Sequence, residues 1–281
     1  MIDRELLISR IDAAIAEDFV GNLDVTTAPT IPSTQRCIAE FRTRKAGVVS
    51  GIDIAIVVLD RVCRGGYEIL SRISDGNIVG SDVTILSVSA LTREILVAER
   101  TALNFLSRLS GISTATHVWV EAISGTKARI RDTRKTTPGW RDLEKYAVLK
   151  GGGVNHRLNL AESALIKDNH IAAVGGIAPA VQAIKAQFPG VLIEVEIDRL
   201  DQLEEAITAG AQEVLLDNMT PAECAQAVAI NSNRVKLEAS GGITLDTVRD
   251  YAQTGVDFIA VGAITHSAPI LDIGLDIKEV N

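Results

Sequence analysis

The sequence predicts an α/β protein built from an N-terminal α+β sandwich layer and an incomplete parallel α/β barrel of six or seven strands. Three observations support this prediction. Short apolar runs recur after residue 128, helical stretches separate most of them, and each run ends in a polar or small residue. Alternation of strand and helix is typical of a parallel sheet. With 281 residues, 47% of them hydrophobic, the chain can form one large domain or two smaller ones.

The first 110 residues have the pattern of the smaller, sandwich-like layer. Leu7, Ile11 and Ile15 lie on one face of a helix, and Cys37–Phe41 alternates as a half-buried strand does. A turn at Asp75-Gly76 leads to a further strand. The remaining expected elements are that strand near 83–85 and a long closing helix over 93–109. We expect the N-terminal domain to span 1–110, joined by 268–281, and the barrel domain to span 111–267.

The second part of the chain repeats a strand followed by a helix. Its strand-length apolar runs contain mostly β-branched and aliphatic residues, and the stretches between several of them have helical character. The expected strands are 128–132, 164–167, 192–197, 213–217, 236–240 and 258–262. The expected helices include 178–187, 200–209, 221–230 and 245–254.

The carboxyl ends of these strands carry residues of chemical use. Parallel barrels build their sites at that end of the strands. An open doubly wound sheet is the rival architecture, but it usually carries a G-x-G-x-x-G fingerprint after its first strand, which this sequence lacks. We therefore favour the barrel. The residues at its strand ends are Asp132, Lys167, Glu196, Asp217, Ser240 and Gly262.

One segment of this acidic chain is basic. Residues 127–170 hold ten Lys and Arg against five Asp and Glu, whereas the formal net charge of the whole chain is −8. A cleft of one charge sign concentrates small molecules of the opposite sign, and five acids cannot neutralise ten bases as surface ion pairs would require. Nucleic-acid binding would need a broad basic face. The expected ligands are therefore small carboxylates or phosphates, not nucleic acid.

Other classes of protein are not favoured by the composition. The first residues lack the features of a signal peptide, and no apolar run approaches a membrane span of about 20 residues. We expect a cytoplasmic protein without a membrane partner. Cys37, Cys63 and Cys224 are far apart and lack a C-x-x-C pattern, so buried free thiols are expected rather than disulfides or a zinc site.

Eight ordered motifs between residues 99 and 267 resemble the quinolinate phosphoribosyltransferase family, also called carboxylating nicotinate-nucleotide pyrophosphorylase. Motifs of this length and order carry far more information than a lone three-residue pattern. They are 99–104, 132–139, 144–147, 151–157, 167–170, 216–219, 238–242 and 265–267. The resemblance implies transfer of phosphoribosyl from phosphoribosyl pyrophosphate to quinolinate with loss of carbon dioxide, giving nicotinate mononucleotide for NAD biosynthesis, with Mg²⁺ as cofactor.

The resemblance also assigns a cationic clamp for quinolinate, a pyridine dicarboxylate. Arginine suits carboxylates because its planar guanidinium forms paired hydrogen bonds. Arg134, His156 and Arg157 match the family's clamp, and Lys135 and Lys167 match catalytic lysines that serve the carboxylate and phosphate sides. Arg100 matches an arginine that enters the site from a neighbouring subunit, which implies a homodimer.

The second substrate explains the acidic strand ends. Positive charge develops on the ribose as pyrophosphate departs, so carboxylates near the sugar are favourable. Glu196 and Asp217 match catalytic residues that hold the ribose hydroxyls and Mg²⁺, a cation that prefers oxygen ligands. Small residues with free N–H groups suit a phosphate. The matching phosphate loops are Ser240, Gly241 and Gly242, and Gly262 with Ala263.

Some features leave alternatives open. Leu23, Trp140 and Ala260 depart from the family pattern, although none removes a charge from the expected site. Gly151–Gly153 can expose N–H groups to a ligand or simply end a helix. Lys167 could act as the amine of a Schiff-base aldolase if it were desolvated. A non-catalytic reading is an anion-binding paralogue, such as the molybdenum-transport-associated relatives. His117, His170 and His266 lack metal spacing, so they are expected to pack in the core or to support residues of the site.

Overall fold

The structure is a computed structural model, and it describes residues 2–280. Contacts within the chain divide it into two compact units. Unit 1 comprises residues 1–117, 142–152 and 268–281, and unit 2 comprises residues 118–141 and 153–267. No helix among residues 2–280 is long and apolar enough to cross a membrane. The three cysteines are free and buried, as expected.

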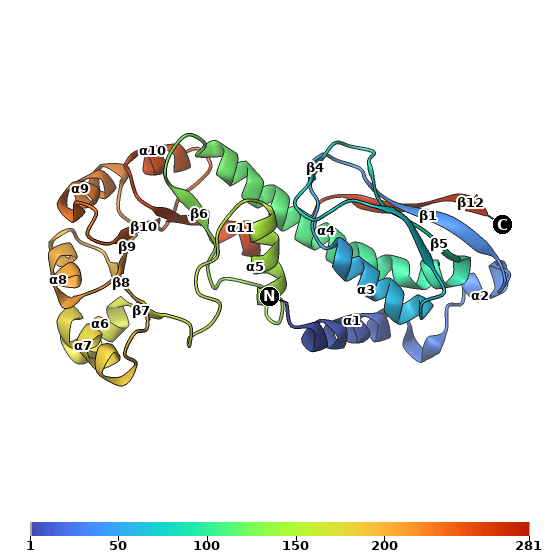
Figure 1. Ribbon diagram of the computed structural model, residues 1–281, viewed down its shortest axis with the longest axis horizontal. Helices are drawn as coiled ribbons and strands as arrows, with labels where there is room; N and C mark the ends of the chain where they lie inside the picture. Colours follow the sequence, from blue (N-terminus) through green and yellow to red (C-terminus); the bar gives the residue numbers. More distant parts are fainter. Residues whose placement is uncertain (1, 281) are drawn as a thin grey trace. The chain divides into compact units, whose positions relative to one another are not determined.

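Unit 1 is organised around a four-stranded antiparallel sheet in the order β12-β1-β5-β3. Strand β1 (Arg36–Thr43) alternates between buried and less buried residues, which confirms the strand expected around Cys37–Phe41. Its neighbour β5 (Thr84–Leu91) contains part of the strand expected near 83–85. The last strand, β12 (Ile273–Val280), pairs with β1, so segments from the two ends of the chain meet in one sheet (Figure 1). The remaining strands are β3 (Glu68–Arg72), β2 (Gly47–Val48) and β4 (Ile78–Val79).

The long helix that begins in unit 1 differs from the sequence expectation. Helix α4 spans Thr92–Ala122 and runs through Gly111, whereas the sequence pattern indicated an end near Leu109. Gly111 does not end the helix. A Cβ atom at this position would lie 2.1 Å from the carbonyl oxygen of Pro269, so the glycine allows the chain at 269–270 to approach the helix backbone. The other helices of unit 1 are α1 (Arg4–Asp18), α2 (Thr27–Thr30), α3 (Ile52–Cys63) and α5 (Arg141–Lys150), with a 3₁₀ turn at Val20–Asn22.

Unit 2 contains the expected parallel sheet. All six predicted strands are present, and each lies within two residues of its expected limits. Hydrogen bonding gives the order β6-β11-β10-β9-β8-β7, and every pair is parallel. The strands are β6 (Arg129–Arg131), β7 (Ala164–Ile166), β8 (Ile193–Ile197), β9 (Glu213–Asp217), β10 (Lys236–Ser240) and β11 (Phe258–Ala260).

The ring of strands is incomplete, as predicted. The last strand, β11, returns to pair with the first, β6. On the other side of β6 an isolated parallel bridge joins Arg131 to Val154. Figure 1 shows the helices of this unit placed around the strands. They are α6 (Asp168–Val174), α7 (Ile177–Gln187), α8 (Asp201–Ala209), α9 (Pro221–Asn231), α10 (Val248–Gln253) and α11 (Ala263–His266).

Candidate active site

A cavity of about 420 Å³ lies at the carboxyl ends of the strands of unit 2. Basic and acidic side chains both line this cavity, and the basic ones come from the basic segment 127–170. Eight of the residues expected in the site line this one cavity. They are Arg134, Lys135, His156, Arg157, Lys167, Glu196, Asp217 and Ser240.

Three different loops supply the cations. Arg134 and Lys135 follow β6, and Lys167 directly follows β7. The segment after the bridge at Val154 carries His156 and Arg157. The backbone N–H of His156 donates to the fully buried Asp132 carboxylate at 2.8 Å, which fixes this segment beside β6. β6 and β7 are the two edge strands of the sheet, and residues that follow each of them line the same cavity, so side chains distant in sequence converge there.

The guanidinium groups of Arg134 and Arg157 carry the clearest sign of an anion site. Within the part of the chain that the structure describes, the Nε atom of each is buried and has no hydrogen-bond partner. Burial lowers the pKa of Arg157 from its usual value, and the charge of Arg134 lowers it further. Buried unpaired donors are costly unless a ligand accepts from them. A carboxylate in the cavity would supply both the hydrogen-bond acceptor and the compensating charge.

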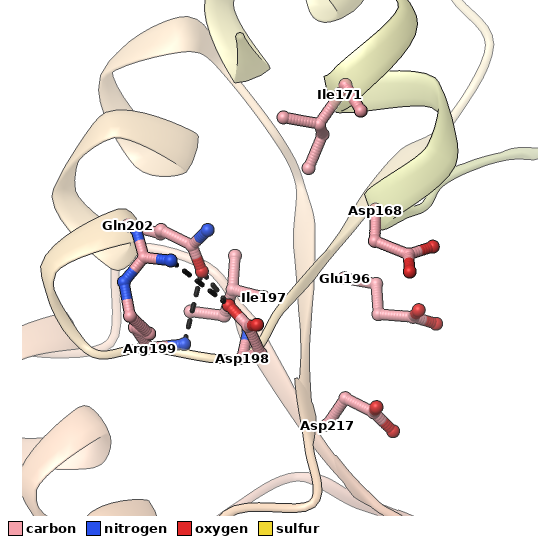
Figure 2. A pocket seen from close by; sticks show the side chains of 9 residues that line it. Asp168, Ile171, Glu196, Ile197, Asp198, Arg199, Gln202 and Asp217 are labelled. Carbon is pink, nitrogen blue, oxygen red and sulfur yellow. Dashed lines mark hydrogen bonds and ion pairs between the residues drawn. The ribbon is translucent and has the colours of Figure 1, made fainter.

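The acidic side of the cavity is formed by Glu196 and Asp217, which stand at the ends of neighbouring strands. The Lys167 ammonium group pairs with the Glu196 carboxylate. Asp217 accepts a hydrogen bond from the side-chain amide of Asn218 at 2.7 Å. A second cavity of about 300 Å³ shares Glu196 and Asp217 with the first. Figure 2 shows their carboxylates, with that of Asp168, directed to the same side.

The expected phosphate loops lie beyond the ends of β10 and β11. Gly241 has a φ angle of +95°, and a Cβ atom there would lie 2.2 Å from the side chain of Asn218, so only glycine fits. At Gly262 a Cβ atom would lie 3.1 Å from the side chains of Lys135 and His266. Of these loop residues only Ser240 lines the cavity; Gly241, Gly242, Gly262 and Ala263 lie further along the two loops.

The structure also reveals buried acidic side chains that the sequence analysis did not assign to the site: Glu238 lines the cavity, and Glu194 does not. Glu194 and Glu238 are each only 1% exposed. The guanidinium of Arg131 binds Glu213 at 2.7 Å and Glu238 at 2.8 Å. The position of Glu194 could have been predicted from the sequence. It lies two residues from Glu196, so the two side chains share one face of β8.

The environment of these glutamates raises the pKa of both carboxyl groups. Burial raises the pKa of Glu194 to about 7, against the opposing charge of Arg131. Burial also raises the pKa of Glu238 to about 7, and the nearby Glu194 carboxylate adds to this effect. The imidazole of His156 lies against both, with Nε2 at 2.8 Å from Glu194 Oε2 and 3.8 Å from Glu238 Oε1. Such strongly perturbed groups at a cavity are typical of functional sites.

Other residues singled out from the sequence have different positions. Arg100 is exposed on α4 of unit 1. Gly151 and Gly152 terminate α5, since their N–H groups donate to the last carbonyls of that helix, so the helix-end interpretation holds for them. His170 accepts the backbone N–H of Lys167 through Nδ1 at 3.0 Å, a supporting role consistent with the expectation. Ala260, one of the departures from the family pattern, lines the cavity.

Comparison with known proteins gives a consistent result over the whole chain. Residues 24–110 match the model described as quinolinate phosphoribosyl transferase, N-terminal domain, and residues 112–276 match the C-terminal domain of the same family. The chain is 48% identical over 268 residues to "Nicotinate-nucleotide pyrophosphorylase [carboxylating]" of Mycobacterium leprae, covering 94% of both chains. It is 40% identical to the probable enzyme of that name from Bacillus subtilis, covering 93% and 90% of the two chains.

Solved structures agree with this result. The nicotinate-nucleotide pyrophosphorylase from Francisella tularensis superposes with a TM-score of 0.95 at 38% identity, covering 99% of this chain and 98% of that chain. The enzyme of the same name from Ehrlichia chaffeensis superposes with a TM-score of 0.92 at 39% identity, covering 99% of each chain. Both similarities extend over the two units and therefore include the cavity.

Proposed function

We infer that this chain, which belongs to the quinolinate phosphoribosyl transferase family, transfers phosphoribosyl from phosphoribosyl pyrophosphate to quinolinate. The products are nicotinate mononucleotide, pyrophosphate and carbon dioxide, so the enzyme is a pentosyltransferase of de novo NAD biosynthesis. The observation that carries this conclusion is the cavity of unit 2, where cationic side chains from three loops face two strand-end carboxylates.

The cationic side of the cavity suits a dicarboxylate. Arg134 and Arg157 present buried Nε donors that lack a partner, and quinolinate brings two carboxylates on adjacent ring carbons. We assign the quinolinate clamp to these arginines together with His156, while Lys135 and Lys167 border the phosphate side. Paired hydrogen bonds between guanidinium and carboxylate fix the plane of the pyridine ring as well as its charge. The ring nitrogen is thereby held toward the sugar.

The acidic side suits the sugar. As pyrophosphate leaves, the ribose C1 becomes electron-poor, and nearby carboxylates stabilise that charge. We assign Glu196 and Asp217 to the ribose hydroxyls and to Mg²⁺. The donor set fits this cation, because both residues offer carboxylate oxygens at neighbouring strand ends, the ligands that Mg²⁺ prefers. When bound, Mg²⁺ supplies charge neutralisation for the departing pyrophosphate.

Loss of carbon dioxide follows from the new bond. Once the ring nitrogen carries ribose, the ring is cationic and can accept the electron pair that the C–C bond leaves on the ring carbon. That carbon then takes up a proton from water, which completes the balance. Loss of carbon dioxide from an ionised carboxylate removes no proton, so the step needs no general base.

The other functions weighed from the sequence are less well supported. A Schiff-base lysine must be desolvated to act as a neutral nucleophile. The side chain of Lys167 is 46% exposed and pairs with Glu196, so it is not desolvated as this chemistry requires. The molybdenum-transport-associated paralogue is not favoured either, because the similar curated proteins carry the pyrophosphorylase name.

A direct assay tests the proposed function. Purified protein is mixed with quinolinate, phosphoribosyl pyrophosphate and Mg²⁺, and carbon dioxide and nicotinate mononucleotide are followed; a parallel reaction contains a metal chelator. We expect product that depends on quinolinate and on the metal. Nicotinate lacks one carboxylate and leaves a buried cation unpaired, a cost of about 2–5 kcal/mol or a rate loss of about 30-fold or more. Equal turnover of nicotinate would contradict a site built for two carboxylates.

A further inference from the structure

The imidazole of His156 is held by a hydrogen bond at each ring nitrogen. Its Nδ1 accepts the backbone N–H of the next residue, Arg157, at 2.7 Å. Its Nε2 lies 2.8 Å from Oε2 of Glu194. Because Nδ1 accepts a hydrogen bond, it carries no proton, so Nε2 is the nitrogen that bears the proton and donates it to the carboxylate. The two bonds together fix both the tautomer and the orientation of the ring.

The ring in turn fixes the main chain that carries a clamp arginine. The His156-Arg157 segment is anchored by Asp132 at the histidine N–H and by the imidazole at the arginine N–H. The Arg157 guanidinium also donates to the carbonyl of Ser163 at 2.8 Å. Glu194 is the buried end of this chain of contacts, since it touches the ring from β8 and is only 1% exposed.

We propose that Glu194 is a positioning residue of the quinolinate end of the cavity. Its carboxylate holds the His156 ring, and the ring holds the Arg157 backbone so that the guanidinium faces the bound dicarboxylate. Glu194 itself does not line the cavity, in contrast to Glu196 on the same face of the strand, so it acts through the cavity residues it holds and not by touching the substrate. The proposal rests on the proposed function, because it concerns the binding of that substrate.

Glu213 provides a matched control. It lies directly opposite Glu194 on the adjacent strand β9 and is also buried. Its carboxylate pairs with Arg131, whereas that of Glu194 pairs with His156. The same substitution at Glu194 and at Glu213 therefore perturbs the sheet similarly but breaks the hydrogen bond to His156 in only one case.

The experiment measures steady-state kinetics for Glu194→Leu, Glu194→Gln and Glu213→Leu. A glutamine oxygen can still accept from Nε2, so Glu194→Gln should keep the KM for quinolinate within about threefold of wild type. Leucine cannot accept, so Glu194→Leu should raise that KM about tenfold or more, as expected when a hydrogen bond to a charged group is lost. The KM for phosphoribosyl pyrophosphate should stay unchanged, and Glu213→Leu should leave both KM values near wild type.

A spectroscopic measurement does not depend on turnover. The chain has four histidines, so ¹⁵N-labelled imidazoles can be resolved by NMR and His156 identified by its loss in His156→Asn. In the wild type and in Glu194→Gln, His156 should show a protonated Nε2 and an unprotonated Nδ1. In Glu194→Leu the hydrogen bond at Nε2 is absent, so the Nε2 signal should shift away from its wild-type position. If Glu194→Leu fails to fold, Glu194→Asp replaces it, because the shorter side chain withdraws the carboxylate from the ring.

The possible results distinguish a failure of the proposed function from a failure of the positioning role of Glu194. If the wild type forms no nicotinate mononucleotide, the proposed function fails, and calorimetric titration of the variants with quinolinate still tests the positioning role. If the wild type is active and the leucine or aspartate variant binds quinolinate as the wild type does, the positioning role fails. A parallel rise of both KM values, or an equal effect of Glu213→Leu, would likewise overturn it, since either would show a general disturbance of the sheet.

Discussion

The two sheets of this protein differ in where their charged side chains lie. In the antiparallel sheet of unit 1, the buried residues of β1 are uncharged, and the charged side chains form ion pairs that remain partly exposed, such as Arg42 with Glu40. In the parallel sheet of unit 2, Glu194, Glu213 and Glu238 are buried within the central strands. Removing a charge from water costs several kcal/mol unless it is well paired. Glu194 and Glu238 lie against His156, which lines the cavity, so two of the buried acids of this sheet adjoin the candidate site.

The largest effect that separates the two regions should come from the strand-end carboxylates of unit 2. We expect Glu196→Gln and Asp217→Asn to lower kcat by about 100-fold or more while the KM for quinolinate changes little, because their charges stabilise the sugar only as pyrophosphate departs. Steady-state kinetics with each substrate varied in turn measures both parameters. Unchanged kcat in both variants would refute the assignment of these carboxylates.

A second prediction links the two units through the expected homodimer, in which Arg100 of one subunit serves the cavity of the other. Arg100→Ala and Lys135→Ala should each be nearly inactive. When the two variants are unfolded, mixed and refolded, half of the randomly formed dimers are mixed, and each mixed dimer has one intact site. Activity should therefore return to about a quarter of wild type, because half of the dimers are mixed and one of the two sites in each is intact.

The refolded mixture must be analysed by mass to establish that mixed dimers are present. Each variant refolded alone is the control and should remain inactive. If mixed dimers form and activity does not return, Arg100 does not act in the neighbouring subunit.

A third prediction concerns the pH dependence that buried glutamates give to unit 2. The pKa of Glu238 is raised from 4.5 to about 7 in the folded protein. The folded state therefore holds a proton that the unfolded state releases, so this contribution to stability is complete below about pH 4.5 and is lost as the pH rises through about 7. Relative to Glu238→Gln, the wild type should lose up to about 3 kcal/mol of unfolding free energy over that range.

Urea titrations of both proteins between pH 5 and pH 8, a range of about three units around the raised pKa, measure this difference. The substitution itself can shift the whole curve, so the comparison is of slopes and not of absolute stability. Parallel curves for the wild type and Glu238→Gln would show that this carboxyl is ionised in the folded protein across the range.

The smallest effect is expected from an exposed ion pair of unit 1. Arg61 Nε lies 2.7 Å from Asp12 Oδ1, but both side chains are nearly half exposed. Water and salt screen such pairs, and their net contribution is usually close to zero. Arg61→Ala should leave the urea midpoint and the activity at wild-type values within experimental error. A clear loss of stability would mean that charge pairing in unit 1 matters as much as it does near the cavity.

The sequence alone determined most of the parallel sheet and the basic half of the site. Each strand of unit 2 is a short apolar run, and the loops after β6 and β7 carry their basic residues close to the strand ends. Local patterns of this kind are readable because burial of a strand imposes its composition on consecutive residues. Residues 268–281 were expected to join the N-terminal domain, but the pairing of β12 with β1 was not predicted, since no local signal connects these two segments.

Only the tertiary structure decided the features that depend on contacts between distant segments. Gly111 suggests a helix end, yet it lies within α4. A glycine is required there because residues 269–270 pack against the helix backbone. Glu194 has the appearance of one more polar residue in a strand, yet the segment after Val154 places His156 over it. In both cases a contact with a segment distant in sequence explains the residue type. A sequence pattern shows which residue is present, but it does not show the distant residue that it contacts.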